Sequence, residues 1–244
     1  MHIGLQLYTV RDQTAQDFKG TIRRVAEMGY EGVEFAGYGN LSAAEMRELL
    51  QETGLKAAGT HVSLLALQED AEREIKYCRE IGCPHLVLPW LGQEWINEEG
   101  LKKLAPILNE LGKRCRDQGI TFAFHNHAAE FTEVAGAYWL DRLFEAVDAE
   151  TLQCELDTYW AAYAGVDPVA YLKRLSGRVP VVHIKDMTPE RTFTEAGAGT
   201  LPIPSYIEAA QAAQSQWYLV ENDAPQIPSL ESAQRSLAYL KGLK

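Results

Sequence analysis

Short apolar runs recur along the chain at intervals that suit β-strands alternating with helices. Each run is rich in β-branched and aromatic side chains and precedes a stretch with helical periodicity. The eight runs cover residues 3–8, 32–36, 56–61, 85–89, 120–126, 151–157, 179–185 and 217–222. Strands joined through helical crossovers run parallel, so the pattern predicts a parallel sheet.

The helical stretches between the runs carry start and stop signals. Alanine, leucine and glutamate recur at three-to-four-residue spacing in residues 42–52, 69–81 and 101–118. Ser42 with Glu45 makes a capping-box sequence, and Asp167 before Pro168 is typical of an N-cap followed by the first helical residue. Glycines before five of the runs fit helix C-caps, where the chain turns left-handed. They are Gly29, Gly54, Gly82, Gly119 and Gly177.

Eight strand and helix pairs in 244 residues match the count and length of a (β/α)8 TIM barrel. An open doubly wound sheet is the alternative, but that fold usually has a glycine-rich turn after its first strand, and Tyr8, Thr9, Val10 and Arg11 stand there. No linker-like or low-complexity stretch interrupts the pattern. We therefore expect one α/β barrel domain over residues 1–244.

Composition narrows the partners and the compartment. The net charge is −11, from 23 basic and 34 acidic residues, and no basic cluster exceeds a pair. Nucleic acid is therefore disfavoured as a substrate, because a phosphodiester surface needs concentrated positive charge. Four cysteines without a Cys-x-x-Cys pair indicate reduced core thiols, and no segment approaches the length of a membrane span. We expect a soluble, cytoplasmic protein, with an acidity and size compatible with a homodimer.

Polar side chains with ligand chemistry stand at the ends of the apolar runs. They are His61, His125, His127, Asp157, His183 and Glu221. In a parallel barrel the active site is built on the carboxyl ends of the strands. Convergence of these residues there would make a metal-assisted active site.

The run around residue 124 ends in two histidines that share a face. With side chains alternating at period two, His125 and His127 lie on the same side as Ala123, while Phe124 and Asn126 lie on the other. A single histidine would favour a hydrogen-bonded cap on the strand. Two on one face favour a ligand or substrate site.

The next run places Glu155 and Asp157 on one face. Two buried carboxylates repel each other and persist mainly where a cation, a histidine or a shared proton compensates. Asp157 as a helix cap is the competing interpretation, and we disfavour it because Asp167 already serves as an N-cap.

The last two runs add a further imidazole, an ammonium and a carboxylate. His183 and Lys185 share a face, and Lys185 either meets an anion in the barrel or extends to the surface. Glu221 follows an apolar run where a metal carboxylate or general base would stand, and helix capping is better assigned to Ser229. Asp157, His183 and Glu221 suit Mn²⁺, Mg²⁺, Co²⁺ or Zn²⁺ without selecting among them.

Seven motifs spread over almost the whole chain resemble the xylose isomerase-like barrel superfamily, in its sugar phosphate isomerase/epimerase branch. They are GLQLYTVRD (4–12), MGYEGVEF (28–35), FHNHAAEF (124–131), ELDTYW (155–160), HIKDM (183–187), EAGAGT (195–200) and VEND (220–223). The resemblance implies a divalent metal held by His125, Asp157, His183 and Glu221. It also implies a carbonyl sugar or polyol substrate and proton abstraction beside the carbonyl.

One position departs from many members of that superfamily, in which the ligand on strand five is a glutamate that pairs with the strand-eight glutamate as acid and base. Here His125 stands there. The departure leaves Glu221 as the clearly placed base, with Glu155, His127 and Lys185 as candidates for a second proton relay. We predict His125 as the fourth ligand and Glu155 as its hydrogen-bonding partner, with exchange of these two roles as the alternative.

Aromatic and imidazole side chains at the strand ends are candidate sugar-binding groups. They are Tyr8, His61, Trp90, His127 and Trp160. Trp160 alternatively only covers the barrel mouth. Epimerisation and isomerisation compete with elimination on a keto-glycoside or inosose, because the His-Asn-His form resembles proteins linked to both.

Two other classes of function compete with a sugar enzyme. A related branch nicks abasic DNA with three zinc ions, but it requires more histidines than His61 alone, and Trp160 stands where one would follow Asp157. A sugar-binding barrel without metal or catalysis is the second, and the metal content of the purified protein would distinguish it.

Overall fold

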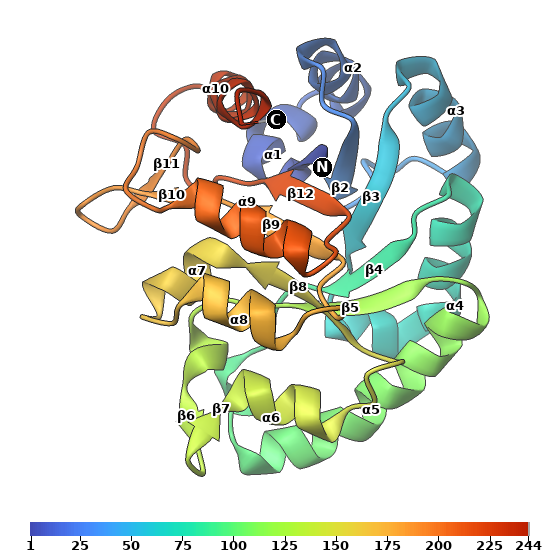
Figure 1. Cartoon of the computed structure of the whole chain (residues 1–244). Helices are drawn as coiled ribbons and strands as arrows, with labels where there is room; N and C mark the ends of the chain where they lie inside the picture. The colour runs from blue at the N-terminus through green and yellow to red at the C-terminus, as the bar shows by residue number, and fades with distance from the viewer. Residues whose placement is uncertain (244) are drawn as a thin grey trace.

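A closed barrel of eight parallel strands forms the centre of the computed structural model, which describes residues 1–243 (Figure 1). Round the barrel the order is β1, β12, β9, β8, β5, β4, β3, β2. The strands are β1 (His2–Gln6), β2 (Gly32–Phe35), β3 (Lys56–His61), β4 (His85–Leu88), β5 (Thr121–His125), β8 (Gln153–Asp157), β9 (Val181–Ile184) and β12 (Trp217–Val220). The predicted TIM barrel is confirmed, and closure rules out the open sheet.

Helices cover the outside of the barrel. The α-helices are α1 (Arg11–Thr14), α2 (Phe18–Met28), α3 (Ala43–Thr53), α4 (Leu64–Ile81), α5 (Glu98–Asp117), α6 (Trp139–Ala146), α7 (Thr158–Tyr163), α8 (Pro168–Arg174), α9 (Ile203–Ala212) and α10 (Ser229–Lys241). Short 3-10 turns occupy Leu7–Val10, Gln93–Trp95 and Ala129–Phe131. Among residues 1–243, no helix is both long and apolar enough to cross a membrane.

Two small hairpins extend the loops at the carboxyl ends of the strands. One pairs β6 (Glu133–Val134) with β7 (Ala137–Tyr138), and the other pairs β10 (Asp186–Met187) with β11 (Phe193–Thr194). Strands of two residues leave no periodic signal, so the sequence pattern did not predict them. Asp186 anchors the loop that follows β11, because its carboxylate accepts hydrogen bonds from the backbone N–H groups of Gly197, Gly199 and Leu201.

Most of the predicted helix signals are confirmed. Ser42 and Glu45 form the capping box of α3, and Asp167 caps α8 with Pro168 in its first turn. The five predicted glycines all have positive φ, between 71° and 91°. Gly29, Gly54 and Gly82 are helix C-caps, whereas Gly119 and Gly177 lie beyond the C-caps of α5 and α8. The prediction that Ser229 caps a helix is wrong. Pro228 is the N-cap of α10, and the Ser229 hydroxyl donates to Asp12 at 2.6 Å.

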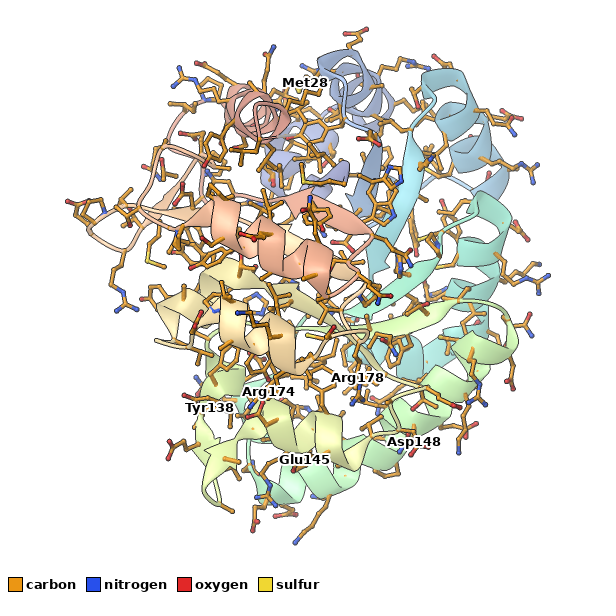
Figure 2. All side chains as sticks on the ribbon, in the orientation of Figure 1. Met28, Tyr138, Glu145, Asp148, Arg174 and Arg178 are labelled. Carbon is orange, nitrogen blue, oxygen red and sulfur yellow. The ribbon has the colours of Figure 1, made fainter. Side chains whose placement is uncertain are left out.

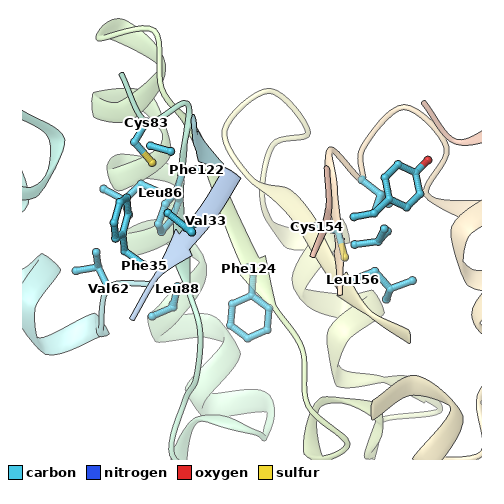
Figure 3. Packing of buried hydrophobic residues seen from close by; sticks show 14 of the residues in the cluster. Val33, Phe35, Val62, Cys83, Leu86, Leu88, Phe122, Phe124, Cys154 and Leu156 are labelled. Atoms are coloured by element: carbon cyan, nitrogen blue, oxygen red, sulfur yellow. The ribbon is translucent and has the colours of Figure 1, made fainter. Parts of the chain in front are cut away.

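The main core fills the layer between the barrel and its helices. Along each strand the outward-facing positions are apolar, as Figure 3 shows for Val33 and Phe35 of β2, Phe122 and Phe124 of β5, and Leu156 of β8. Because side chains alternate along a strand, the intervening positions face the barrel axis. The outer core therefore fixes which residues point inward.

A second, small apolar cluster plugs the barrel interior at the amino ends of the strands. It consists of Ala58, Val181, Trp217 and Leu219. Gly4 and Gly32 make room for it, since a Cβ atom on either would lie 2.6 Å from Leu219 or Trp217 respectively. The polar active-site candidates occupy inward-facing positions beyond this plug.

Arg178 ties the approach to β9 to the chain between α6 and β8 (Figure 2). Its guanidinium donates to the backbone carbonyls of Phe144 at 2.8 Å, Leu152 at 2.9 Å and Val147 at 3.1 Å. One planar side chain thus satisfies three carbonyls in a region with little regular structure.

Candidate active site

Inward-facing side chains from neighbouring strands gather in two levels above the apolar plug. Glu155 and Asp157 of β8 occupy successive inward positions, and His183 and Lys185 do the same along β9. The level nearer the mouth, called the upper set, consists of His125, Asp157, His183 and Glu221. The level below, called the lower ring, consists of Glu34, His61, Glu155 and His183.

The upper set has the geometry of a metal site. Each of its four residues offers a ligand atom, and all four atoms lie within 4.8 Å of one another. Nδ1 of His183 lies 2.7 Å from Oε2 of Glu221, while Nε2 of His125 lies 3.8 Å from Oδ2 of Asp157. Two imidazoles and two carboxylates suit Zn²⁺, Mn²⁺ or Co²⁺, so these residues fit the metal that the sequence predicts.

Asp157 uses its two oxygens differently. Oδ1 accepts from the backbone N–H of Trp160 at 2.8 Å and caps α7, a role that the sequence analysis judged the weaker interpretation. The error came from treating α7 and α8 as one helix, so that Asp167 appeared to be its only cap. Oδ2 is buried and makes no hydrogen bond, although Nζ of Lys185 lies 2.9 Å away. Capping and metal binding are therefore compatible at this residue.

Lys185 is buried in the site and does not extend to the surface. Its ammonium lies 2.9 Å from Asp157, 2.7 Å from Glu221 and 2.8 Å from Asp223, and 1% of the residue is exposed. Burial disfavours its charge, but these three carboxylates outweigh burial and raise the pKa of Lys185. Lys185 is thus a fixed cation beside the upper set.

The lower ring holds a residue that the sequence analysis missed. Glu34 of β2 is fully buried, and its carboxylate accepts from Gln6 at 2.7 Å and lies 2.8 Å from Nε2 of His183. Gly59 makes room for it, because a Cβ there would lie 2.3 Å from Oε1 of Glu34. The available signal was a single carboxylate inside the apolar run 32–36.

Glu155 contacts three imidazole rings of the site, those of His61, His125 and His183. Its Oε1 is 2.7 Å from Nε2 of His61, 3.0 Å from Nε2 of His183 and 3.1 Å from Nδ1 of His125. Glu155 is fully buried and does not line the cavity above. This position matches a hydrogen-bonding partner of His125, as the sequence predicts.

The charged states of the histidines separate according to their neighbours. Burial lowers the pKa of His125 well below its usual value, and the nearby His183, His127 and His61 lower it further. Burial opposes the charge on His61 as well, but Glu34 and Glu155 outweigh it and raise its pKa to about 10. His125 is therefore neutral, as a metal-binding imidazole must be.

His127 is neutral and open to the cavity. Burial, followed by the charge of Lys185, lowers the pKa of His127 to about 4. Its Nδ1 has no hydrogen-bond partner, and its backbone N–H is held by Glu130 at 2.8 Å. The ring thus lines the cavity, while its buried Nδ1 has no hydrogen-bond partner.

A cavity of about 520 Å³ opens directly above the upper set. Its lining residues are Tyr8, Ala36, His61, Pro89, Trp90, His125, His127, Glu221 and Asp223. Trp90 is 63% exposed and Tyr8 is 44% exposed, so aromatic faces are available to stack on a sugar ring. A hollow of about 770 Å³ lies at the opposite end of the barrel, around Lys56 and Trp217, and no residue of the upper set or the lower ring lines it.

Trp160 does not line this cavity. Its ring lies 5.5 Å from His127 and 5.6 Å from Phe193, and Nζ of Lys185 lies 5.8 Å from it. This packing makes Trp160 a wall behind His127. The structure therefore brings Tyr8, His61, Trp90 and His127 to the cavity and places Trp160 outside its lining.

The chain belongs to the xylose isomerase-like TIM barrel family, whose profile matches residues 22–243. A relative from Geobacillus kaustophilus (strain HTA426), named inosose dehydratase, is 24% identical over 242 residues, which cover 82% of this chain and 78% of the relative.

Two solved structures share the fold. A sugar phosphate isomerase/epimerase from Parabacteroides distasonis ATCC 8503 has a TM-score of 0.87 at 22% identity, covering 98% of this chain and 97% of that one. The IOLI protein with a bound zinc atom has a TM-score of 0.77 at 15% identity, covering 100% and 98%.

Proposed function

We propose that this protein is a divalent-metal-dependent enzyme that removes a proton from the carbon beside the carbonyl of a keto-sugar or related polyol. The observation that carries the proposal is the upper set, four ligand residues within 4.8 Å of one another on the floor of an aromatic-rimmed cavity. A divalent ion there would polarise the substrate carbonyl and stabilise the enediolate. The IOLI structure shares this fold and holds a zinc atom, which supports a metal in this barrel.

Glu221 is the proposed general base. It lines the cavity and is 6% exposed, so a substrate carbon can approach its carboxylate. Burial alone would favour protonation, but Lys185 and His183 outweigh burial and lower the pKa of Glu221 well below its usual value. The carboxylate is thus ionised and ready to accept a proton.

His127 is the best-supported second proton relay among the three candidates. Glu155 lies below the upper set without lining the cavity, and Lys185 is held by three carboxylates. His127 lines the cavity, is neutral and has an Nδ1 without a hydrogen-bond partner. A proton from water, passed to the enediolate through the His127 ring, would give an epimer or isomer.

Elimination is the second candidate outcome of the same first step. It is favoured by the relative named inosose dehydratase and by the imidazole of His125 where a second catalytic carboxylate would otherwise stand. After proton removal, departure of a hydroxyl from the next carbon would give an unsaturated ketone in place of an epimer. Tyr8 and Trp90 would hold the ring in either reaction.

The test is isotope exchange in D₂O with Mn²⁺, using keto-sugars, inososes and 3-keto-glycosides. We expect deuterium beside the carbonyl only when metal is present, and a loss of about 10²-fold or more in Glu221→Gln. Metal content measured in parallel separates loss of the base from loss of the ion, and Glu208→Gln on the exposed face of α9 is the matched control. Loss of water from the product would identify a lyase.

Exchange that persists without metal, or no exchange with any carbonyl sugar, contradicts the proposal. His127→Gln should keep its metal and its proton removal but lose epimer formation. Equal epimer formation in that variant would exclude His127 as the relay.

A further inference from the structure

Four side-chain atoms from four strands close the lower ring. Nε2 of His61 lies 3.1 Å from Oε2 of Glu34 and 2.7 Å from Oε1 of Glu155. Nε2 of His183 lies 2.8 Å from the same Glu34 oxygen and 3.0 Å from the same Glu155 oxygen. Nitrogen and oxygen therefore alternate round the ring, and the side chain of His61 is the most exposed of the four at 12%.

Hydrogen bonds within the ring leave polar atoms unsatisfied. Each imidazole nitrogen carries at most one proton, so two N–H groups serve four nitrogen–oxygen contacts. The other oxygens of the two carboxylates, Oε1 of Glu34 and Oε2 of Glu155, are buried and have no hydrogen-bond partner. Unsatisfied buried carboxylate oxygens are costly, and an ion bound by both oxygens of each carboxylate would satisfy them.

We propose that the lower ring is a second divalent transition-metal site, joined to the upper set through the imidazole of His183. Tetrahedral Zn²⁺ with bonds of about 2 Å holds its donor atoms about 3.3 Å apart. The nitrogen–oxygen contacts of the ring are 2.7–3.1 Å, so the ring would open by a few tenths of an ångström to hold the ion. His183 would present Nδ1 to the upper ion and Nε2 to the lower one as an imidazolate. Nε2 protons of His61 and His183 would be released as the lower ion binds.

The donor set selects the kind of ion. Two imidazole nitrogens and two carboxylate oxygens suit Zn²⁺, Mn²⁺ or Co²⁺ and disfavour Ca²⁺ and Mg²⁺, which prefer oxygen ligands. His125 is a further donor at the same level, because its ligand atom lies within 4.8 Å of those of His61, Glu155 and His183.

The test is a count of bound metal in the whole protein. Metal is first removed with a chelator, and the protein is reloaded with Zn²⁺ or Mn²⁺. After unbound ion is removed, the bound metal is counted by inductively coupled plasma mass spectrometry. We expect two equivalents in the wild type and one in Glu34→Gln and in His61→Gln. The control is Glu74→Gln on α4, which removes a buried carboxylate that contacts Arg73 and Tyr38. This variant should keep two equivalents of metal.

Electron paramagnetic resonance gives an independent readout with Mn²⁺. Two ions bridged by His183 should show a coupled spectrum, and Glu34→Gln should show the six-line spectrum of an isolated ion. Circular dichroism of each variant checks its folding, and the two single variants of the ring substitute for each other if one does not fold.

One equivalent in the wild type at saturating metal overturns the inference, as do two equivalents in both Glu34→Gln and His61→Gln. The ring would then be a hydrogen-bonded support for His183. The inference is independent of the proposed reaction. Two bound ions without proton exchange would refute the proposed function and leave this site in place, whereas exchange with one ion would do the reverse.

Discussion

One carboxylate oxygen orients three imidazole rings in this barrel. Because Nδ1 of His125 faces Oε1 of Glu155 at 3.1 Å, its Nε2 is directed toward Asp157 and the upper set. Hydrogen bonds of this kind fix the tautomer of a metal-binding histidine and raise its basicity. We therefore expect Glu155 to act on the upper set through His125 and not by contact with a metal there.

This arrangement predicts different losses for the two residues. His125→Ala should weaken metal binding at the upper set as severely as Asp157→Ala, whereas Glu155→Gln should lower affinity by about 10- to 100-fold. Calorimetric titration in a Glu34→Gln background restricts the measurement to the upper set. If Glu155→Gln abolishes binding and His125→Ala retains it, the two roles are exchanged.

Glu130 offers a pH-dependent test outside the metal-binding residues. Burial raises the pKa of Glu130 above its usual 4.5, so between the unfolded and folded pKa values the folded protein binds more protons. Its contribution to stability is present below the unfolded pKa and is lost as pH rises through the folded pKa. Each unit of difference is worth about 1.4 kcal/mol.

Glu130→Gln should remove this dependence, since the amide does not titrate and still accepts from the N–H of His127. Urea unfolding of both proteins between about pH 4 and 7 should show the variant gaining stability relative to the wild type as pH rises. A constant difference, or one of the opposite sign, would contradict the assignment.

Among the secondary-structure elements, the segment from α6 to β8 is held to the approach to β9 by the side chain of Arg178. Arg178→Lys should destabilise the fold by about 1–3 kcal/mol, because a lysine ammonium does not reproduce the planar fork that serves three carbonyls. Arg174→Lys, in an exposed pair with Asp141, is the matched control and should cost less than about 1 kcal/mol. Denaturant unfolding measures both, and equal effects would refute the role of Arg178.

The sequence was sufficient to predict the elements whose pattern repeats along the chain. Strand periodicity, the glycine C-caps and the capping box at Ser42 are local signals, and all eight barrel strands follow the predicted runs within a few residues. The division of the helical stretch after β8 into α7 and α8 was missed, because Asp157 and Asp167 are both good caps and only the three-dimensional turn shows two helices.

Contacts between distant strands explain what the sequence did not reveal. Glu34 is a lone carboxylate in an apolar run, and its role depends on His61 and His183, which are brought to it only by barrel closure. The wall position of Trp160 likewise depends on Phe193 in a hairpin without periodicity. Residues at strand ends were predictable because the carboxyl ends of parallel strands meet at one face.

At the scale of the whole molecule, the upper set joins four neighbouring strands on one side of the barrel. An ion held by β5, β8, β9 and the residue after β12 therefore opposes global unfolding, and saturation at about 100 times the dissociation constant should add about 2.7 kcal/mol. For a chain of this size, we expect Mn²⁺ to raise the melting temperature by about 5–10 °C. Calorimetry with and without chelator measures the shift.

Asp157→Asn should reduce that shift, while Glu74→Gln should retain it. A melting temperature that does not respond to Mn²⁺, Zn²⁺ or Co²⁺ in the wild type would show that the site binds none of these ions in the folded protein.

The position of Trp90 gives this protein its own optical reporter. Trp139 and Trp217 are buried and Trp95 and Trp160 are half-buried, whereas Trp90 is 63% exposed at the cavity mouth. Its indole is therefore surrounded by water. A sugar that stacks on the indole displaces this water and shifts the fluorescence emission maximum to shorter wavelength. Candidate ligands can thus be ranked by fluorescence titration, without any turnover and before the reaction itself is known.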